Sequence, residues 1–274
     1  NKIDILLEKV IQMGKIISLV NQKGGVGKTT TSINLSASLA VLGKRVLLVD
    51  LDPQGNATTG VGFNKGDINL SVYDVITGKC NVVDAIKKTG YKNLYLMPAT
   101  INLAGVDIEL MEKSKEDSTF GKGKQLKNAL DQIRDSFNYI IIDCPPSLGL
   151  ITTNALTASD SVIIPVQCEF FALEGITQLL NTIMLAQKSL NPNLNIEGVL
   201  LTMLDSRTNL GLEVVEEIQK YFKERVYNTI IPRLVRLTEA PSHGKPIIAY
   251  DPKNKGSEAY LNLAKEVIER NGNI

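Results

Sequence analysis

Short, uninterrupted apolar runs alternate along this chain with longer stretches in which apolar residues recur every three or four positions. The runs have the length of strands buried on both faces of a parallel sheet, and the periodic stretches have helical spacing. The runs span 16–20, 46–49, 94–97, 139–143, 160–166 and 197–203. The periodic stretches span 31–42, 103–111, 125–133, 176–190, 212–222 and 256–268. This alternation predicts an α/β fold with a doubly wound, mostly parallel sheet and helices on both faces.

Two stretches fall outside that alternation. Residues 1–12 carry apolar side chains on one helical face, and Met13 stands directly before the first strand. We expect them to be an upstream extension or an expression remnant, with a docking helix for a partner or a lipid as the alternative. Residues 13–274 are expected to form a single domain of ordinary length. The charged, glycine-bearing stretch 112–124 predicts a mobile surface connection.

The segment between the first strand and the first helix has the composition of a phosphate-binding loop. Glycines let backbone N–H groups approach an anion, and the following helix adds unpaired donors at its positive end. In such a loop the lysine reaches the β- and γ-phosphates and the next threonine ligates Mg²⁺, which assigns these roles to Lys28 and Thr29. A glycine turn that only connects strand and helix is the alternative. The loop reads Gln22, Lys23, Gly24, Gly25, Val26, Gly27, Lys28, Thr29, Thr30.

Two later strands deliver aspartates to the carboxyl edge of the sheet, where ligands bind in doubly wound folds. Asp50 and Asp52 follow the second strand, and Asp143 ends the run 139–143. Phosphoryl transfer mainly needs a positioned water and neutralised charge, which suits Asp52, while a carboxylate at Asp143 would hold Mg²⁺ opposite the loop threonine. Each aspartate has a plainer alternative as the cap of a loop or a helix.

Together these motifs resemble the ParA/Soj chromosome-partitioning ATPases, a family of P-loop NTPases within the deviant Walker A (ParA/MinD) superfamily. The general P-loop pattern would place its first glycine at Gln22, whereas this chain has Lys23 beside the loop, as in the deviant form. Residues 50–56, DLDPQGN, resemble the family's switch I, and residues 143–147, DCPPS, resemble its switch II. The resemblance covers roughly residues 14–270.

The resemblance implies an ATPase that forms a homodimer around two ATP molecules with Mg²⁺. Lys23 would cross the dimer to the partner's nucleotide and act with Lys28 in catalysis, unless it is a plain surface lysine. Asp52 would orient the attacking water. Nucleotide contacts would come from residues 23–30. The metal site would comprise Thr29, Asp52 and Asp143.

The resemblance is incomplete at the adenine site. After Ile231, Pro232 and Arg233, related sequences often carry an asparagine that helps to hold adenine, and this chain has Leu234. Main-chain contacts around Met203 and Pro232 are expected to serve instead.

Charge gives a weaker indication of partners. The formal net charge of +1 provides no global attraction to nucleic acid or membrane. Between residues 223 and 255, however, seven Lys or Arg face three acidic residues. Such a surface binds phosphate backbones without reading bases, although a solvated face explains it equally well. The resemblance implies that Arg207 and Arg236 bind double-stranded DNA non-specifically in the ATP-bound dimer.

The family further implies that hydrolysis releases the DNA and that a ParB/Spo0J-like centromere-binding protein stimulates turnover. It also implies a cytoplasmic, nucleoid-associated protein. Cysteine usage agrees with a reducing cytoplasm, because the three cysteines have no C-x-x-C spacing.

Rival classes fit less well. A nitrogenase-iron-protein-like reductase needs paired cysteines for its cluster, and Cys80, Cys144 and Cys168 lack that context. A MinD-type membrane-cycling ATPase needs an amphipathic anchor, whereas the last helix has alternating charges and no basic, bulky apolar face. No apolar run approaches about 18 residues, and no signal peptide is present, so no membrane association is expected.

Two isolated features are expected to carry no chemistry. Residues 64–67, NKGD, match the guanine-reading tetrapeptide of GTPases in letters, but they do not follow a buried strand late in the fold. His243 lies in a turn-rich segment, 241–246, with no second ligand nearby, and is expected to be structural.

Overall fold

Within the described part of the chain, seven strands form one sheet, and six of them run parallel. The computed structural model describes residues 13–117, 120, 123–147, 149–169 and 174–272, so the predicted helix over residues 1–12 lies outside the described part. The order across the sheet is β3-β4-β2-β5-β1-β6-β7, and only β3 pairs antiparallel. The strands are β1 Lys15–Leu19, β2 Val46–Asp50, β3 Lys87–Lys88, β4 Leu94–Met97, β5 Tyr139–Asp143, β6 Ser161–Gln167 and β7 Asn195–Thr202. The predicted doubly wound, mostly parallel sheet is confirmed.

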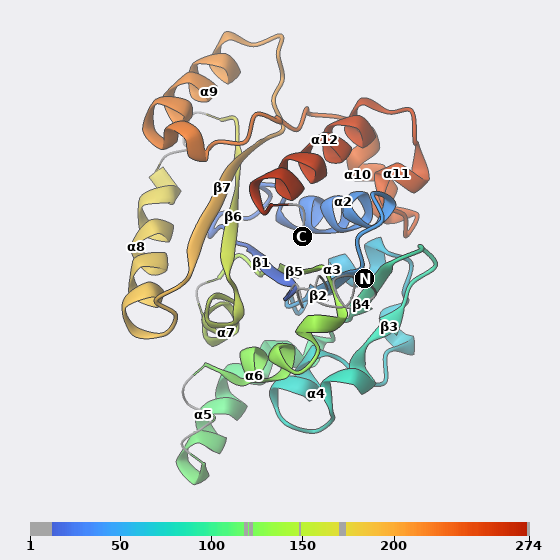
Figure 1. Cartoon of the computed structure of the whole chain (residues 1–274), viewed down its shortest axis with the longest axis vertical. Helices are drawn as coiled ribbons and strands as arrows, with labels where there is room; N and C mark the ends of the chain where they lie inside the picture. Colours follow the sequence, from blue (N-terminus) through green and yellow to red (C-terminus); the bar gives the residue numbers. More distant parts are fainter. Residues whose placement is uncertain (1–12, 118–119, 121–122, 148, 170–173, 273–274) are drawn as a thin grey trace, which may run out of the picture.

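Helices cover both faces of this sheet (Figure 1). One face carries α2 Lys28–Val41, α3 Asn56–Gly60, α10 Val235–Ser242, α11 Ile247–Tyr250 and α12 Lys255–Arg270. The other carries α4 Val72–Ile76, α5 Val106–Glu116, α6 Gln125–Asp131, α7 Leu150–Ala158, α8 Glu174–Ser189 and α9 Asn209–Phe222. Short 3₁₀ turns lie at η1 Lys65–Asp67, η2 Val82–Ala85, η3 Ile101–Gly105, η5 Arg134–Ser136 and η6 Lys223–Arg225.

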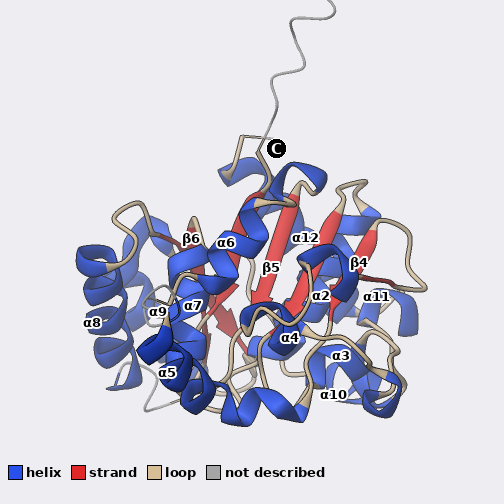
Figure 2. Ribbon diagram, turned by 90° about the horizontal axis from the view of Figure 1, so that it is seen from below, coloured by secondary structure: helices blue, strands red, loops and turns tan. Residues whose placement is uncertain are grey.

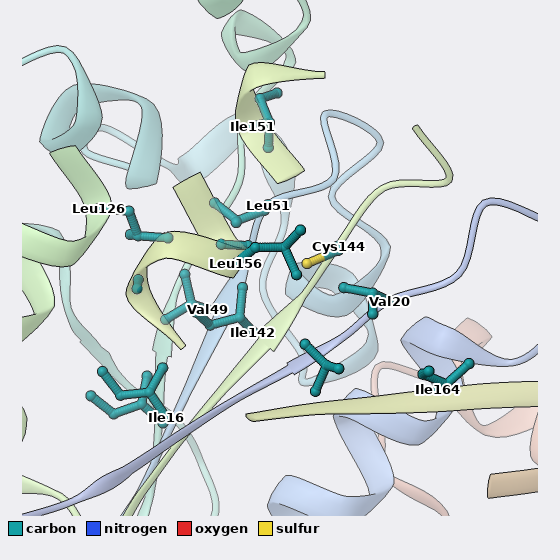
Figure 3. Close-up of a cluster of buried hydrophobic side chains, with 14 of the residues drawn as sticks. Ile16, Val20, Val49, Leu51, Leu126, Ile142, Cys144, Ile151, Leu156 and Ile164 are labelled. Atoms are coloured by element: carbon teal, nitrogen blue, oxygen red, sulfur yellow. The ribbon is translucent and has the colours of Figure 1, made fainter. Parts of the chain in front are cut away.

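Two hydrophobic cores result, one on each face, because successive strand residues point in opposite directions. Ile16 and Ile17 are neighbours on β1 and both are fully buried, one in each core. Figure 3 shows the first core, where Ile142 of β5 lies under Leu156 of α7. Each fully buried aliphatic side chain stabilises the fold by about 1.5–3 kcal/mol. The sheet therefore forms a rigid base for the loops at its carboxyl edge.

The sequence prediction was wrong over part of the region between β4 and β5. The helix expected at 103–111 begins as η3, and α5 continues to Glu116 into the stretch expected to be a surface connection. Lys113 supports this extension, since it pairs with Glu109 one turn earlier and its Nζ donates to the carbonyl oxygen of Thr77, 2.6 Å away. The pattern also missed β3 and the helices α3, α4, α7, α10 and α11.

Candidate nucleotide-binding and hydrolysis site

The glycine-rich loop lies where the interior strand β1 ends and α2 begins, at the carboxyl edge of the sheet. A cavity of about 270 Å³ opens there. Residues from the loop, from the segments after β2 and β5, and from the end of β7 line it together. They are Gly24, Gly25, Gly27, Lys28, Thr29, Thr30, Asp52, Asn56, Pro146 and Met203. The structure thus brings most of the predicted site residues to one cavity.

Two glycines give the loop its course. Gly25 has φ 77° and Gly27 has φ 87°, values in the left-handed region that other residues rarely adopt. Gly27 is the N-cap of α2 in that conformation. A Cβ placed on Gly24 or Gly25 would meet no atom within 4 Å, so the space above the loop is open to a ligand. The backbone donors at the start of α2 therefore face an accessible cavity that suits phosphate.

Two residues that the sequence reasoning did not single out hold the loop in place. The Asn21 amide donates to the carbonyl oxygen of Pro165, 2.7 Å away, and accepts from the backbone N–H of Lys23 at 3.0 Å. The Thr202 hydroxyl donates to the carbonyl oxygen of Val26 at 2.9 Å. Val26 is itself 2% exposed and does not line the cavity, so it contributes only backbone. Pro165 and Thr202 are distant from the loop in sequence, so no local pattern identifies the bonds that they make to it.

Lys28 extends back over the loop. Its Nζ donates to the carbonyl oxygen of Lys23 at 3.0 Å, and the residue is 6% exposed. Burial lowers the pKa of Lys28, and the negative charges of Asp143 and Asp52 act in the opposite direction. The ammonium group is thus held among carboxylates at the phosphate cavity.

Asp143 lies beneath the cavity rather than on its wall. It is fully buried, and its Oδ1 accepts from the Ser32 hydroxyl at 2.8 Å. Its Oδ2 is buried without a hydrogen-bond partner among the described residues. Burial raises the pKa of Asp143 to about 7, and the Asp50 carboxylate adds to this, while Ser32 and Thr29 oppose it. An unsatisfied buried carboxylate oxygen beside the loop threonine fits a Mg²⁺ ligand.

Asp50 has a structural role beneath the segment that carries Asp52. Its Oδ2 accepts from the backbone N–H and the hydroxyl of Thr58 at 2.7 and 2.8 Å, and its Oδ1 accepts from the backbone N–H of Asp52 at 3.1 Å. Burial raises the pKa of Asp50 to about 6 despite these bonds. Asp52 lies on the cavity wall, where its Oδ1 accepts from the backbone N–H of Gln54 at 2.9 Å. Asp50 therefore fixes the turn that presents Asp52.

The stability of the metal-free protein is expected to fall as pH rises across the range set by these two carboxyls. Their folded pKa values of about 6 and 7 exceed the unfolded value of 3.8, so the folded state binds more protons between pH 3.8 and about 7. The Asp143→Asn variant should lose less unfolding free energy than the native protein between about pH 5 and pH 8. Urea unfolding in EDTA measures this, with the exposed Asp84→Asn as control. Equal losses in native protein and Asp143→Asn would contradict the assigned pKa.

Lys23 does not line the cavity. Its Nζ lies 3.9 Å from Glu169, whose carboxylate also pairs with Arg233 at 3.0 Å. The side chains of Lys23 and Glu169 are 42% and 45% exposed, so this pair contributes little to stability. Lys23 is consequently available to a second molecule.

A second, mostly apolar cavity of about 160 Å³ adjoins the first, and the two share Gly27, Thr30 and Met203. Pro232 and Leu234 line it, as Tyr260 does from α12. Met203 has φ 55°, a left-handed conformation that is strained for a side chain of its size. The predicted contacts Met203 and Pro232 therefore meet beside the loop, in a cavity with the character of a base-binding site.

The two predicted DNA-binding arginines lie outside both cavities. A β-bridge between Leu204 and Pro232 places the segments that carry them side by side at the end of β7. Arg207 pairs with Asp205 at 2.7 Å and its side chain is 86% exposed, while Arg236 pairs with Glu239 at 3.1 Å and is 54% exposed. The local basic surplus is thus partly neutralised by neighbouring acids, although such exposed pairs are weak.

The structure also places the isolated features of the sequence. Residues 65–67 form the exposed turn η1, Asn64 is its N-cap, and none of the four lines either cavity. The His243 ring stacks on Tyr250, with centroids 5.0 Å apart, which fits a structural role. Among the described residues there is no cluster of three or more possible metal ligands. No helix within the described ranges has the length and apolar character needed to cross a bilayer.

Comparison with known proteins agrees with this geometry. A family model described as an AAA domain matches residues 14–196. The sporulation initiation inhibitor protein Soj of Bacillus subtilis (strain 168) is 63% identical over 255 residues, which cover 93% of this chain and 98% of that protein. The chain belongs to the ParA/Soj family of chromosome-partitioning ATPases.

Further ParA/Soj relatives and solved structures extend this agreement over nearly the whole chain. The chromosome partitioning protein ParA of Myxococcus xanthus is 50% identical over 258 residues, covering 94% of this chain and 89% of that protein. A structure of cobyrinic acid a,c-diamide synthase from Mycobacterium smegmatis with bound ADP and magnesium superposes with a TM-score of 0.80 at 38% identity. It covers 92% of this chain and 93% of the other. The P-loop fold expected from the ParA/Soj resemblance is therefore confirmed.

Proposed function

We propose that this protein is a Mg²⁺-dependent ATPase of DNA partitioning that forms a homodimer around two ATP molecules, binds double-stranded DNA as that dimer and releases it after hydrolysis. The observation that carries the proposal is the glycine cradle with Lys28 beside the buried carboxylate of Asp143. The names of its ParA and Soj relatives support the partitioning role, and the ADP and magnesium of the solved neighbour support the ligands.

Each residue at the cavity has a separate role in ATP hydrolysis in this proposal. Backbone N–H groups of residues 24–30 bind phosphate oxygens, and Lys28 neutralises charge on the β- and γ-phosphates. Asp52, presented on the cavity wall, orients the attacking water. Thr29 and Asp143, with Asp52 close by, would hold Mg²⁺, which would supply positive charge to the phosphate oxygens. Little covalent chemistry is needed from the protein, because the transition state is loose.

Adenine occupies the apolar cavity beside the loop in this proposal. The main chain at Met203 and Pro232 contacts the base, and Leu234 contributes packing without a hydrogen bond. The same cavity wall continues into Thr30 and Gly27, so base and phosphates lie on one continuous surface.

Dimer formation uses Lys23 as a contact to the partner's nucleotide. The exposed pair between Lys23 and Glu169 is weak, so exchanging the carboxylate for a phosphate costs little. The γ-phosphate then holds the segments around Asp52 and Asp143 in the dimer-competent arrangement, and its loss relaxes them.

The buried face of α12 argues against a membrane-cycling role for the C-terminal helix. Its residues Tyr260, Leu263 and Val267 are at most 1% exposed and belong to the core against α2. An amphipathic anchor needs an apolar face free to enter lipid. The apolar face of α12 therefore stabilises the fold and is not free to enter a membrane. The partners in this proposal are double-stranded DNA and a ParB/Spo0J-like protein.

DNA binding is expected to depend on both ATP and Arg236. Arg236→Glu should weaken binding of a random-sequence duplex by at least about tenfold, and each lost phosphate contact should reduce the salt slope by about 1. Fluorescence anisotropy titrations with ATP, ADP and no nucleotide measure this, with the exposed Lys92→Glu as a charge-matched control. Native binding that ignores the nucleotide would contradict the switch. Native-like, ATP-dependent binding by Arg236→Glu would contradict the assigned arginine alone.

A further inference from the structure

A carboxylate on α5 reaches the start of α7, the helix that follows the switch II segment. Oδ2 of Asp107 accepts from the backbone N–H of Leu150 at 3.2 Å. The N-cap residue of α7 is Gly149, which has no side chain to satisfy that donor. Asp107 therefore caps α7 from a different helix, where a negative charge also complements the helix dipole.

The Asp107 carboxylate is packed closely against Gly149. A Cβ placed on Gly149 would lie 2.7 Å from Oδ2 of Asp107, so a larger residue there would displace the carboxylate. Oδ1 of Asp107 is buried and has no hydrogen-bond partner among the described residues. Burying a carboxylate oxygen without a partner is costly. The bond to the Leu150 N–H offsets part of this cost and ties the carboxylate to the start of α7.

The start of α7 lies close in sequence to a residue of the phosphate cavity. Pro146 lines the cavity, Ser147 follows it in the chain, and Gly149 is the residue directly before α7. The Thr152 hydroxyl donates to the carbonyl oxygen of Ser147 at 2.5 Å, so the first turn of α7 and this segment are held together. The helices α5 and α7 lie side by side (Figure 2). The bond from the Leu150 N–H to Asp107 joins them at the start of α7, the end that follows Pro146 and Ser147 in the chain.

We propose that Asp107 is a positioning residue for ATP hydrolysis, because its cap on α7 fixes the segment that carries Pro146 against the phosphate cavity. The inference rests on the proposed ATPase function. Asp107 does not line the cavity and touches no reacting atom, so it acts on the geometry of turnover rather than on nucleotide affinity.

Steady-state kinetics of the full chain test this. Asp107→Ala should lower kcat about 10- to 100-fold, as expected when a residue distant from the reacting atoms shifts the groups around the substrate by a small distance. The KM for ATP should stay within about twofold of the native value. Asp107→Asn keeps an acceptor for the Leu150 N–H and should recover most of kcat. Glu112→Ala removes an exposed charge from the same helix and should behave as native protein.

Gly149→Ala provides a second route to the same contact if Asp107→Ala does not fold. Its Cβ displaces the carboxylate, so it should lower kcat in the same way, and the double variant should be no slower than the slower single one. A native kcat in either single variant, or a fall in nucleotide affinity that matches the fall in kcat, overturns the positioning role. A native protein without ATP turnover overturns the proposed function itself, and this inference with it.

Discussion

Replacing Asp52 with alanine is expected to reduce ATP turnover by about 10²- to 10⁴-fold while ATP still binds. Asp52 lies on the wall of the phosphate cavity, and it is held there by the bond between Asp50 and the Asp52 backbone. Asp52 is proposed to orient the attacking water and not to bind the phosphates. Its removal should therefore lower the rate of hydrolysis and leave the affinity for ATP unchanged. A phosphate-release assay gives the turnover, and a fluorescent ATP analogue gives the affinity.

The same variant tests the dimer. With ATP bound and hydrolysis blocked, Asp52→Ala should remain at twice the monomer mass in light scattering, whereas the native protein returns to the monomer as ATP is consumed. The exposed Asp84→Ala serves as the control for loss of one aspartate outside both cavities. Native turnover in Asp52→Ala would remove the water-orienting role, and a particle mass independent of nucleotide would remove the ATP-bridged dimer.

Replacing Lys28 with alanine is expected to weaken ATP binding by about 10- to 150-fold, the equivalent of one charge-assisted hydrogen bond of about 1.5–3 kcal/mol. Lys28 is buried at the cavity, and its ammonium group interacts with the carboxylates of Asp143 and Asp52. Without it, the triphosphate would meet the negative field of those carboxylates. Calorimetric titration with a non-hydrolysable ATP analogue and Mg²⁺ measures the change.

Lys92→Ala, which removes an exposed lysine outside both cavities, provides the comparison and should bind as the native protein does. Thermal unfolding of Lys28→Ala without nucleotide separates a loss of binding from a loss of fold. Undiminished affinity in a folded Lys28→Ala would show that the phosphates are held by backbone N–H groups alone.

Much of the fold could be predicted because its signals are local. A buried parallel strand is apolar at every position, and the glycine loop between β1 and α2 is recognisable from nine consecutive residues. Short helices such as α3 and α4 were missed, since five residues contain too few turns to show a period. The extension of α5 was missed because Lys113 is stabilised by Thr77, which is remote in sequence.

The sequence by itself determined that this chain is an α/β P-loop protein with the motifs of the ParA/Soj family, and it singled out the loop and the aspartates that are proposed to serve the nucleotide. Only the tertiary structure decided the pKa values of the aspartates and the shape of the cavities. It buries Asp143 and Asp50, which raises both pKa values, and the Asp50 carboxylate raises that of Asp143 further. It also joins Met203 to Pro232 in one cavity. The physical reason is that charge repulsion, desolvation and cavity shape depend on atoms brought together from distant parts of the chain.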